Sequence, residues 1–438
     1  MAAVKEEVAG RNGIVIRRRE YDSDTPGYRT YEVYQRERVG ESTEKIKPIQ
    51  LVSDDYRRTP YPLLEILREN YPCYRDWLAN SYWISQYNDV TSIFADDANF
   101  ETRPKTYCYH IEDFGRDLGN ELSVLNAEAS CIEEHTAEVA TNIATDLAEK
   151  GNGDLATEFA ARFAIDLLAK RYDVPESDIS EFGARYWRMQ RGTSWEPRLQ
   201  DDGMKAINEL VAYFKPAVAA KKGGPDMVSA MAELGAGPED VVRTLLEGDH
   251  QTLHGALANM WYLLLMHPTE FEKARSDKRL MKLAYLETVR HSTPVISADR
   301  FARHEVERFG RLLPAGARLI CSAAAANRDP RIFSDPDKFI VDRRDMCQRE
   351  PRGHYRADGL ATGITFGLGK PSVHPAVPED RPVSRYAITR DTAVAASMIL
   401  LDHIGGLQIA EGASPHLISL TVGEMHACWN LPVTFRKN

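Results

Sequence analysis

Polar side chains interrupt a long apolar stretch of the chain. Residues 238–268 lie between two prolines and have the spacing of one long helix, which is apolar nearly all round at its centre. Glu247, Asp249 and His250 lie within that centre, where polar groups need partners or a purpose. A histidine and a carboxylate whose pKa is raised by burial can exchange protons with a bound molecule. If the protein is an enzyme, these three are its candidate catalytic residues, for isomerisation, dehydration or cyclisation.

Residue spacing also suggests two other kinds of site, a metal site and a phosphate loop. His250 and His254 are four residues apart, a helical spacing that can hold a metal ion, and Glu247 shares their face. The zinc-protease pattern needs Glu directly after the first histidine, and Gln251 stands there, so a buried polar network is favoured. The glycine-rich stretch 363–371 resembles a phosphate loop, but five residues instead of four separate its outer glycines and a proline follows its lysine. We therefore predict neither a metal site nor a phosphate loop.

The elements that must position these residues are mostly helices. An amphipathic pattern predicts a helix over 153–174, with one apolar face. A last helix is expected over 388–404, and short strands over 81–90, 307–322 and 417–435. The sequence thus predicts a mainly α fold with small β-sheets, in a single domain over 48–438.

The N-terminal residues 1–47 have a different, charge-dense character. Residues 13–21 and 28–39 look like strands, and the cluster of turn-forming residues 22–27 separates them. We expect an N-terminal β-hairpin added to the main domain. A partly disordered arm is the alternative.

Composition narrows the classes of partner. Of the 438 residues, 43% are hydrophobic, and the 55 Lys and Arg against 65 Asp and Glu give a net charge of −10. This balance argues against nucleic acid or an anionic membrane as the main partner. The N-terminus lacks the apolar core of a secretory signal, and no apolar run is long enough to span a membrane. The six cysteines form no CxxC pair, so we expect no disulfide framework and a cytoplasmic location.

An ordered set of motifs gives the chain a family resemblance. Residues 285–295 contain an ExxR motif, residues 298–344 carry GxxLPAGxxL, NRDP and FxDPDKFxxDR in that order, and TFGLG follows at 365–369. Together they resemble the cytochrome P-450 superfamily, the haem-thiolate monooxygenases, over about residues 50–438. An isolated ExxR is usually a surface ion pair. The resemblance implies a structural role for Glu287 and Arg290, which would lock the segment near 342–344.

The chain departs from the family where the chemistry is done. The family needs a cysteine thiolate on the haem iron, and the matching position is Val373, with no cysteine between Cys347 and Cys428. His374, next to it, is either a replacement iron ligand or a histidine of an inserted loop. The family's acid and Thr positions on the central helix hold His250 and Gln251 here. Oxygen activation by the usual route is therefore not expected.

The haem-anchoring residues are partly retained. His135 and Arg300 match two of the family's propionate-binding positions, while Val139 stands at a third, where the family has Arg. If haem is bound, the resemblance therefore assigns it to His135, Arg300 and His374. We expect no cofactor, and the alternative is haem held by a ligand other than cysteine.

Two functions remain open. The first is a haem-free accessory protein that activates a partner enzyme such as a glycosyltransferase in bacterial natural-product biosynthesis, a role that some cysteine-less members of the family have. The second is an enzyme that uses the old pocket for a small hydrophobic ligand without activating oxygen. A conventional monooxygenase is disfavoured, and whether the protein is an enzyme at all stays open.

Overall fold

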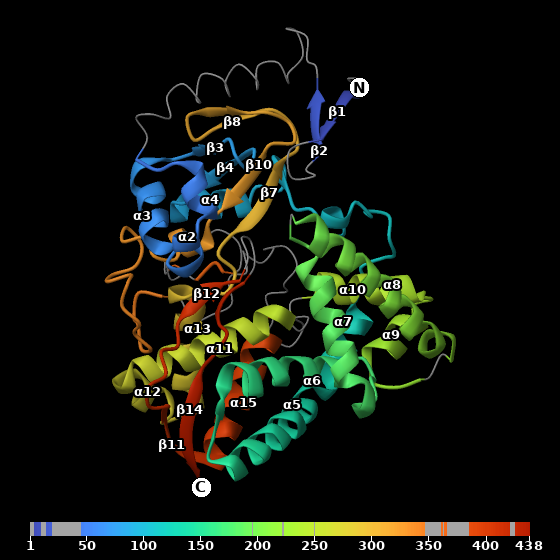
Figure 1. The fold of residues 1–438 in the computed structure, drawn as a ribbon, viewed down its shortest axis with the longest axis vertical. Helices are drawn as coiled ribbons and strands as arrows, with labels where there is room; N and C mark the ends of the chain where they lie inside the picture. The colour runs from blue at the N-terminus through green and yellow to red at the C-terminus, as the bar shows by residue number, and fades with distance from the viewer. Residues whose placement is uncertain are drawn as a thin grey trace.

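The computed structural model describes residues 4–9, 15–19, 45–194, 196–220, 223–248, 250–346, 361, 363–365, 385–420 and 425–438. It is mainly helical with small sheets, as the sequence predicts (Figure 1). Of the helices described, none is both long and apolar enough to cross a membrane.

A five-stranded sheet lies at one end of the molecule, with strand order β3-β4-β10-β7-β5 (Figure 1). Strand β10 pairs in parallel with β4 and antiparallel with β7. The predicted strand over 81–90 is only half right, because a helix starts at Tyr87. The strands and the helices around them are β3 (Tyr74–Asp76), β4 (Ser81–Ile84), β5 (Phe100–Glu101), β7 (Ala298–Ala302), β10 (Arg318–Cys321), η2 (Pro48–Val52), α2 (Asp54–Arg58), α3 (Tyr61–Asn70), α4 (Tyr87–Phe94) and α14 (Ala323–Ala326). A small hairpin of β8 (Val306–Arg308) and β9 (Arg311–Leu313) precedes β10.

The other end is a bundle of helices around the largest apolar core. The predicted amphipathic face of 153–174 is confirmed, since its five large apolar residues are fully buried: Leu155, Phe159, Phe163, Leu167 and Leu168. That segment begins as a strand and a π-helical turn before the α-helix starts. The elements of the bundle are α5 (Leu122–Lys150), β6 (Asn152–Asp154), the π-helix η4 (Leu155–Ala161), α6 (Arg162–Arg171), α11 (His250–Met266), α12 (Pro268–Ala274), α13 (Lys278–His291) and α15 (Arg385–His403).

A second core lies between the helices on the flank of the bundle. Its elements are η3 (Lys105–Tyr109), η5 (Glu176–Asp178), α7 (Ile179–Arg191), α8 (Pro197–Ala220), α9 (Met227–Glu233) and α10 (Pro238–Glu247). Helices α7 and α8 pack against each other, and α10 packs on α8.

The chain ends in strands that fasten it to the bundle. Strand β12 (Leu417–Ser419) pairs with β13 (His426–Cys428), which confirms part of the predicted strand pair. Strand β14 (Pro432–Lys437) instead joins β11 (Ile404–Ile409) and β6 in a separate sheet.

The N-terminal hairpin is built from a different pair of segments than expected. Strand β2 (Val15–Arg19) lies within the predicted strand over 13–21, but it pairs with β1 (Val4–Ala9). The expected second strand over 28–39, and the turn over 22–27, lie outside the described residues.

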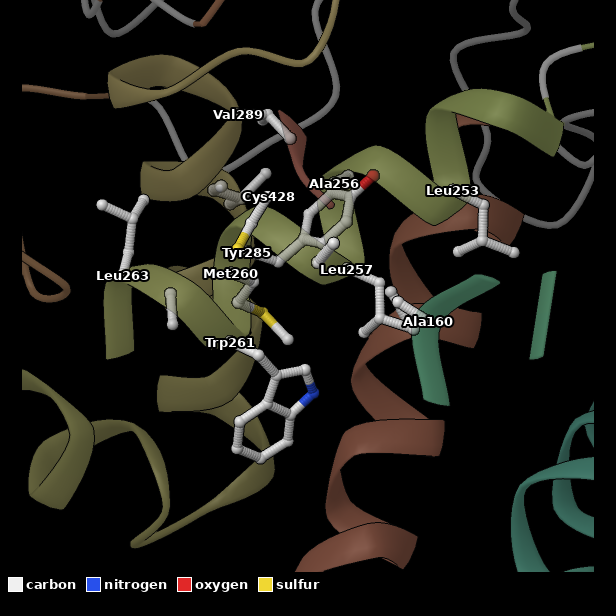
Figure 2. Packing of buried hydrophobic residues seen from close by; sticks show 14 of the residues in the cluster. Ala160, Leu253, Ala256, Leu257, Met260, Trp261, Leu263, Tyr285, Val289 and Cys428 are labelled. Carbon is white, nitrogen blue, oxygen red and sulfur yellow. The ribbon is translucent and has the colours of Figure 1, made fainter. Parts of the chain in front are cut away.

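The prediction of one central helix over 238–268 is wrong. Helix α10 ends at Glu247, Gly248 has extended backbone angles (φ −66°, ψ 158°), and α11 begins at His250. Helix α11 is buried in the core as predicted: Figure 2 shows Ala256, Leu257 and Met260 among side chains from neighbouring elements. The break therefore separates a core helix from a flanking one.

Candidate functional site

Glu247 lies at the break between α10 and α11 and holds another segment of the chain. Its Oε2 accepts a hydrogen bond from the main-chain N–H of Lys105 at 2.9 Å, and its Oε1 accepts one from Thr106 at 3.3 Å. These N–H groups open the short helix η3, where a carboxylate is favoured by the unpaired donors and the helix dipole. Burial raises the pKa of Glu247, and the bonds from Lys105 and Thr106 oppose that rise. The carboxylate therefore acts as a cap on η3.

Two long side chains satisfy the carbonyl groups at the end of α10. Lys105 Nζ donates to Gly248 O at 3.0 Å and to Gln190 Oε1 at 3.2 Å. Gln190 Nε2 donates in turn to Leu246 O at 3.0 Å. The last carbonyls of a helix have no partner within it, so buried helix ends need such donors. This explains why the central helix can end at Glu247 inside the protein.

The proposed acid–base trio is only partly described. Asp249 lies outside the described residues, and His250 contributes its backbone to α11 while its side chain is not described. Of the three, only Glu247 has contacts that can be stated. Among the described residues, no group of three or more His, Cys, Asp and Glu has a geometry that could hold a metal ion.

His254 is buried between two tryptophans. Its ring centroid is 5.5 Å from that of Trp187 on α7 and 5.3 Å from that of Trp429, both in edge-on geometry. Burial lowers its pKa to about 4, and its Nδ1 has no hydrogen-bond partner among the described residues. His254 is therefore a neutral ring of the core at neutral pH. The sequence placed it beside Glu247 but gave no sign of the tryptophans.

Further polar groups surround η3 on the side of the five-stranded sheet. Burial raises the pKa of the Cys108 thiol to about 11, and the nearby Asp299 carboxylate adds to this rise. Asp299 is paired with Arg318 at 2.7 Å across β7 and β10. The thiol is thus protonated at neutral pH and is not poised as a nucleophile. Sequence analysis missed this cluster because its members come from three distant segments.

Glu287 and Arg290 form a fully buried ion pair, 2.7 Å apart, on α13. Glu287 Oε1 also accepts from the N–H of Ile340 at 3.0 Å and from Arg343 Nε at 3.2 Å. Arg290 donates to main-chain carbonyls of the same region, including Lys338 O at 3.2 Å. The pair thus ties α13 to the segment over 336–343.

The two described candidates for haem anchors, His135 and Arg300, lie on different elements, α5 and β7. Arg300 on β7 is largely buried, its guanidinium lies 4.5 Å above the ring of Phe94, and it has no ion pair within the described part of the chain. His135 lies on α5, where burial and the neighbouring Lys170 and Arg171 lower its pKa. Figure 1 shows α5 and β7 in different halves of the molecule. His374 lies outside the described residues.

The residues that are present do not fit a haem-thiolate centre. The start of the matching loop is held in place, because Ile364 N–H donates to Asn327 Oδ1 at 2.8 Å. The cysteine that should follow is missing from the sequence, which has none between Cys347 and Cys428. Of the two described propionate anchors, only Arg300 is a buried charge without a counter-ion within the described residues.

Comparison with known proteins finds relatives that include cytochrome P-450 enzymes. No protein-family model matches it. It is 24% identical to pulcherriminic acid synthase of Bacillus subtilis over 355 residues, covering 75% of this chain and 86% of that protein. It is 30% identical to the cytochrome P-450 monooxygenase PikC of Streptomyces venezuelae over 238 residues, 51% of this chain and 53% of that one.

Solved structures show the same fold. The bacillaene polyketide synthase cytochrome P-450 PksS of Bacillus subtilis has a TM-score of 0.70 at 18% identity, over 88% of this chain and 99% of that one. P-450 BioI in complex with an acyl carrier protein carrying hexadec-9Z-enoic acid has a TM-score of 0.71 at 21% identity, over 87% and 100%. The chain is thus similar in sequence to cytochrome P-450 proteins and shares their fold.

Proposed function

We propose that this protein is a haem-free member of the superfamily that acts as an accessory protein of a partner enzyme in bacterial natural-product biosynthesis. We favour a glycosyltransferase as the partner enzyme, and we expect the protein to work in the cytoplasm. The observation that carries the proposal is the structural role of Glu247. Its carboxylate caps η3 by accepting hydrogen bonds from two main-chain N–H groups. A group with that structural duty is poorly placed to serve as a proton donor in turnover.

The missing iron ligand supports the same conclusion. Without a cysteine at the loop, the electron donation that promotes O–O cleavage in this family is lost. Relatives support the setting, since they include a cyclomarin C epoxidase and a 6-deoxyerythronolide B hydroxylase. The complex of P-450 BioI with a carrier protein supports the idea that this fold can present a surface to a protein partner.

A second candidate function is an enzyme that uses the old pocket without oxygen activation. The cluster of Cys108, Glu247 and Asp299 favours it, because these groups are only partly buried and the two carboxylates lie close enough to the Cys108 thiol to raise its pKa. Such polar groups suit a small hydrophobic ligand that carries one polar group.

The two functions are separated by assaying the protein with and without a partner. The visible spectrum of the purified protein shows first whether haem is bound. Glu247→Gln and His250→Ala should leave stimulation of a co-expressed glycosyltransferase intact if the protein is an accessory. Turnover of a small molecule by the protein alone, abolished by both substitutions while the fold persists, would reject the accessory role. Deleting residues 1–40 then tests whether the N-terminal segment binds the partner.

A further inference from the structure

A small cavity lies between α3 and the chain that runs from α14 to residue 337, and Figure 1 shows α3 at the sheet end of the molecule. Its volume is about 190 Å³, below the ~300–1,000 Å³ of pockets that take drug-sized ligands. The side chains that line it from one face of α3 include Tyr61, Glu65 and Arg68, which have helical spacing. The opposite side is lined by Ala325, Arg328 and Asp337. The cavity therefore suits only a small molecule.

The Arg68 guanidinium is a buried charge with donors to spare. Its side chain is only 7% exposed. Its Nε donates to Glu69 Oε1 at 2.8 Å, and its Nη1 donates to Ala325 O at 3.0 Å. Its Nη2 has no hydrogen-bond partner in the part of the chain that the structure describes. Because Arg68 lines the cavity, the open Nη2 donors are available to an anionic group inside it.

Arg328 brings a second guanidinium to the cavity, and its orientation is fixed. Its side chain is 11% exposed, and its guanidinium carbon lies 3.4 Å from the centroid of the Tyr61 ring. Its Nε and Nη2 donate to His291 O at 2.9 and 2.7 Å, and its Nη1 pairs with Asp337 at 3.1 Å. A charge held in this way loses little freedom when a ligand binds beside it.

Two carboxylates lie nearer to solvent than the two guanidinium groups. Glu65 is exposed, and it pairs with no group among the described residues. The side chain of Asp337 is 77% exposed. The charged groups that line the cavity are thus two buried cations and two exposed anions. A simple anion would meet the carboxylates and a simple cation the guanidinium groups, whereas a molecule that carries both charges can satisfy both pairs.

From this arrangement we propose that the cavity binds a free α-amino acid with a small side chain. Its carboxylate accepts hydrogen bonds from Arg68 and Arg328, and its ammonium group donates to Glu65 and Asp337, all of them charge-assisted. The bound amino acid bridges α3 and the loop after α14, so it stabilises the folded protein. None of these four residues belongs to the pocket considered under the proposed function, and the inference does not depend on that function.

Isothermal titration calorimetry of the full-length protein tests the site with three probes of nearly the same shape. L-alanine carries both charges, propionate lacks the ammonium group and ethylamine lacks the carboxylate. We expect L-alanine to bind, and propionate and ethylamine to bind at least about tenfold more weakly, since each lacks one set of charge-assisted hydrogen bonds. Saturating L-alanine should also raise the melting temperature.

Substitutions in the cavity assign the two charges. Glu65→Gln should weaken L-alanine binding about tenfold and leave propionate binding unchanged or stronger. Arg68→Gln should weaken the binding of both. The matched control is Glu233→Gln, which changes an exposed glutamate of α9 and should alter neither. Because Glu65 is exposed and unpaired among the described residues, its variant should keep the wild-type melting temperature, and it decides the test if Arg68→Gln does not fold.

Three results would overturn the proposal. The first is the absence of L-alanine binding at about 10 mM, a concentration that would reveal even a millimolar dissociation constant. The second is equal binding of L-alanine and either single-charge probe, which would make the cavity a plain anion or cation site. The third is unchanged L-alanine binding by Glu65→Gln, which would remove the ammonium group from the place assigned to it.

Discussion

Removing the Glu287 carboxylate should cost a large part of the protein's stability. Glu287 accepts four hydrogen bonds, two from Arg290 at 2.7 Å, one from Ile340 N–H at 3.0 Å and one from Arg343 Nε at 3.2 Å. Both members of the ion pair are 0% exposed, and the side chain of Arg343 is 3% exposed. Glu287→Gln would leave the buried Arg290 guanidinium without its counter-charge, and Arg343 with Asp345 as its remaining carboxylate partner among the described residues.

The magnitude follows from the bonds that are lost. A hydrogen bond to a charged group is worth about 1.5–3 kcal/mol, and breaking a buried ion pair from one side costs about 3–5 kcal/mol. Folded proteins are stable by only about 5–15 kcal/mol, so a fifth or more of the free energy of unfolding should disappear. We expect a much lower urea midpoint, followed by far-UV circular dichroism.

The chain provides a matched control for this measurement. Glu272 and Arg275 have the same order and spacing as Glu287 and Arg290, 3.3 Å apart, but their side chains are 67% and 49% exposed. Glu272→Gln should change the free energy of unfolding by about 0.5 kcal/mol or less. Equal urea midpoints for the two variants would refute the reasoning from burial.

Three further predictions concern protonation, haem and packing. Burial lowers the pKa of three histidines: His254, His291 and His426. For His254 and His426 the pKa falls from 6.5 to about 4, so the unfolded chain takes up these two protons at a higher pH than the folded protein does. The free energy of unfolding should therefore be full above about pH 6.5. It should drop by about 3 kcal/mol for each histidine as the pH falls to about 4. Urea unfolding at several pH values checks this, and His254→Phe should flatten the profile; an unchanged slope would contradict it. The protein mixed with haem should show no thiolate-type carbon monoxide difference band, because Val373 replaces the ligand, and such a band would overturn this expectation. Gly255→Ala would drive a Cβ into Met425 and lower stability by about 1–3 kcal/mol, whereas Gly223→Ala, with nothing within 4 Å, should not; equal melting temperatures would refute the packing argument.

The sequence predicts those features that depend on local pattern or on a motif with fixed spacing. The apolar face of 153–174 and the helix over 388–404 follow from residue periodicity. Glu287 and Arg290 were found because their spacing is part of a motif, although nothing local showed that they would be buried.

Features decided by distant partners could not be predicted. The residues over 238–268 have one uninterrupted helical pattern, yet the helix breaks at Gly248, because Lys105 and Gln190 supply the donors that its carbonyl groups need. These two residues are 143 and 58 positions away from Gly248 and belong to no pattern with it. From its place in an apolar helical pattern, Glu247 was predicted to be a candidate acid. Its contacts with a distant segment instead make it the cap of η3.

The two carboxylates, Glu287 and Glu247, have different structural roles. The Glu287 network holds α13 against the segment over 336–343, a duty that folding requires whether or not haem is present. Glu247 has such a role in η3, and His254 has become a neutral ring between tryptophans. The buried network of Glu287 and the cap made by Glu247 thus give two carboxylates of this chain structural roles.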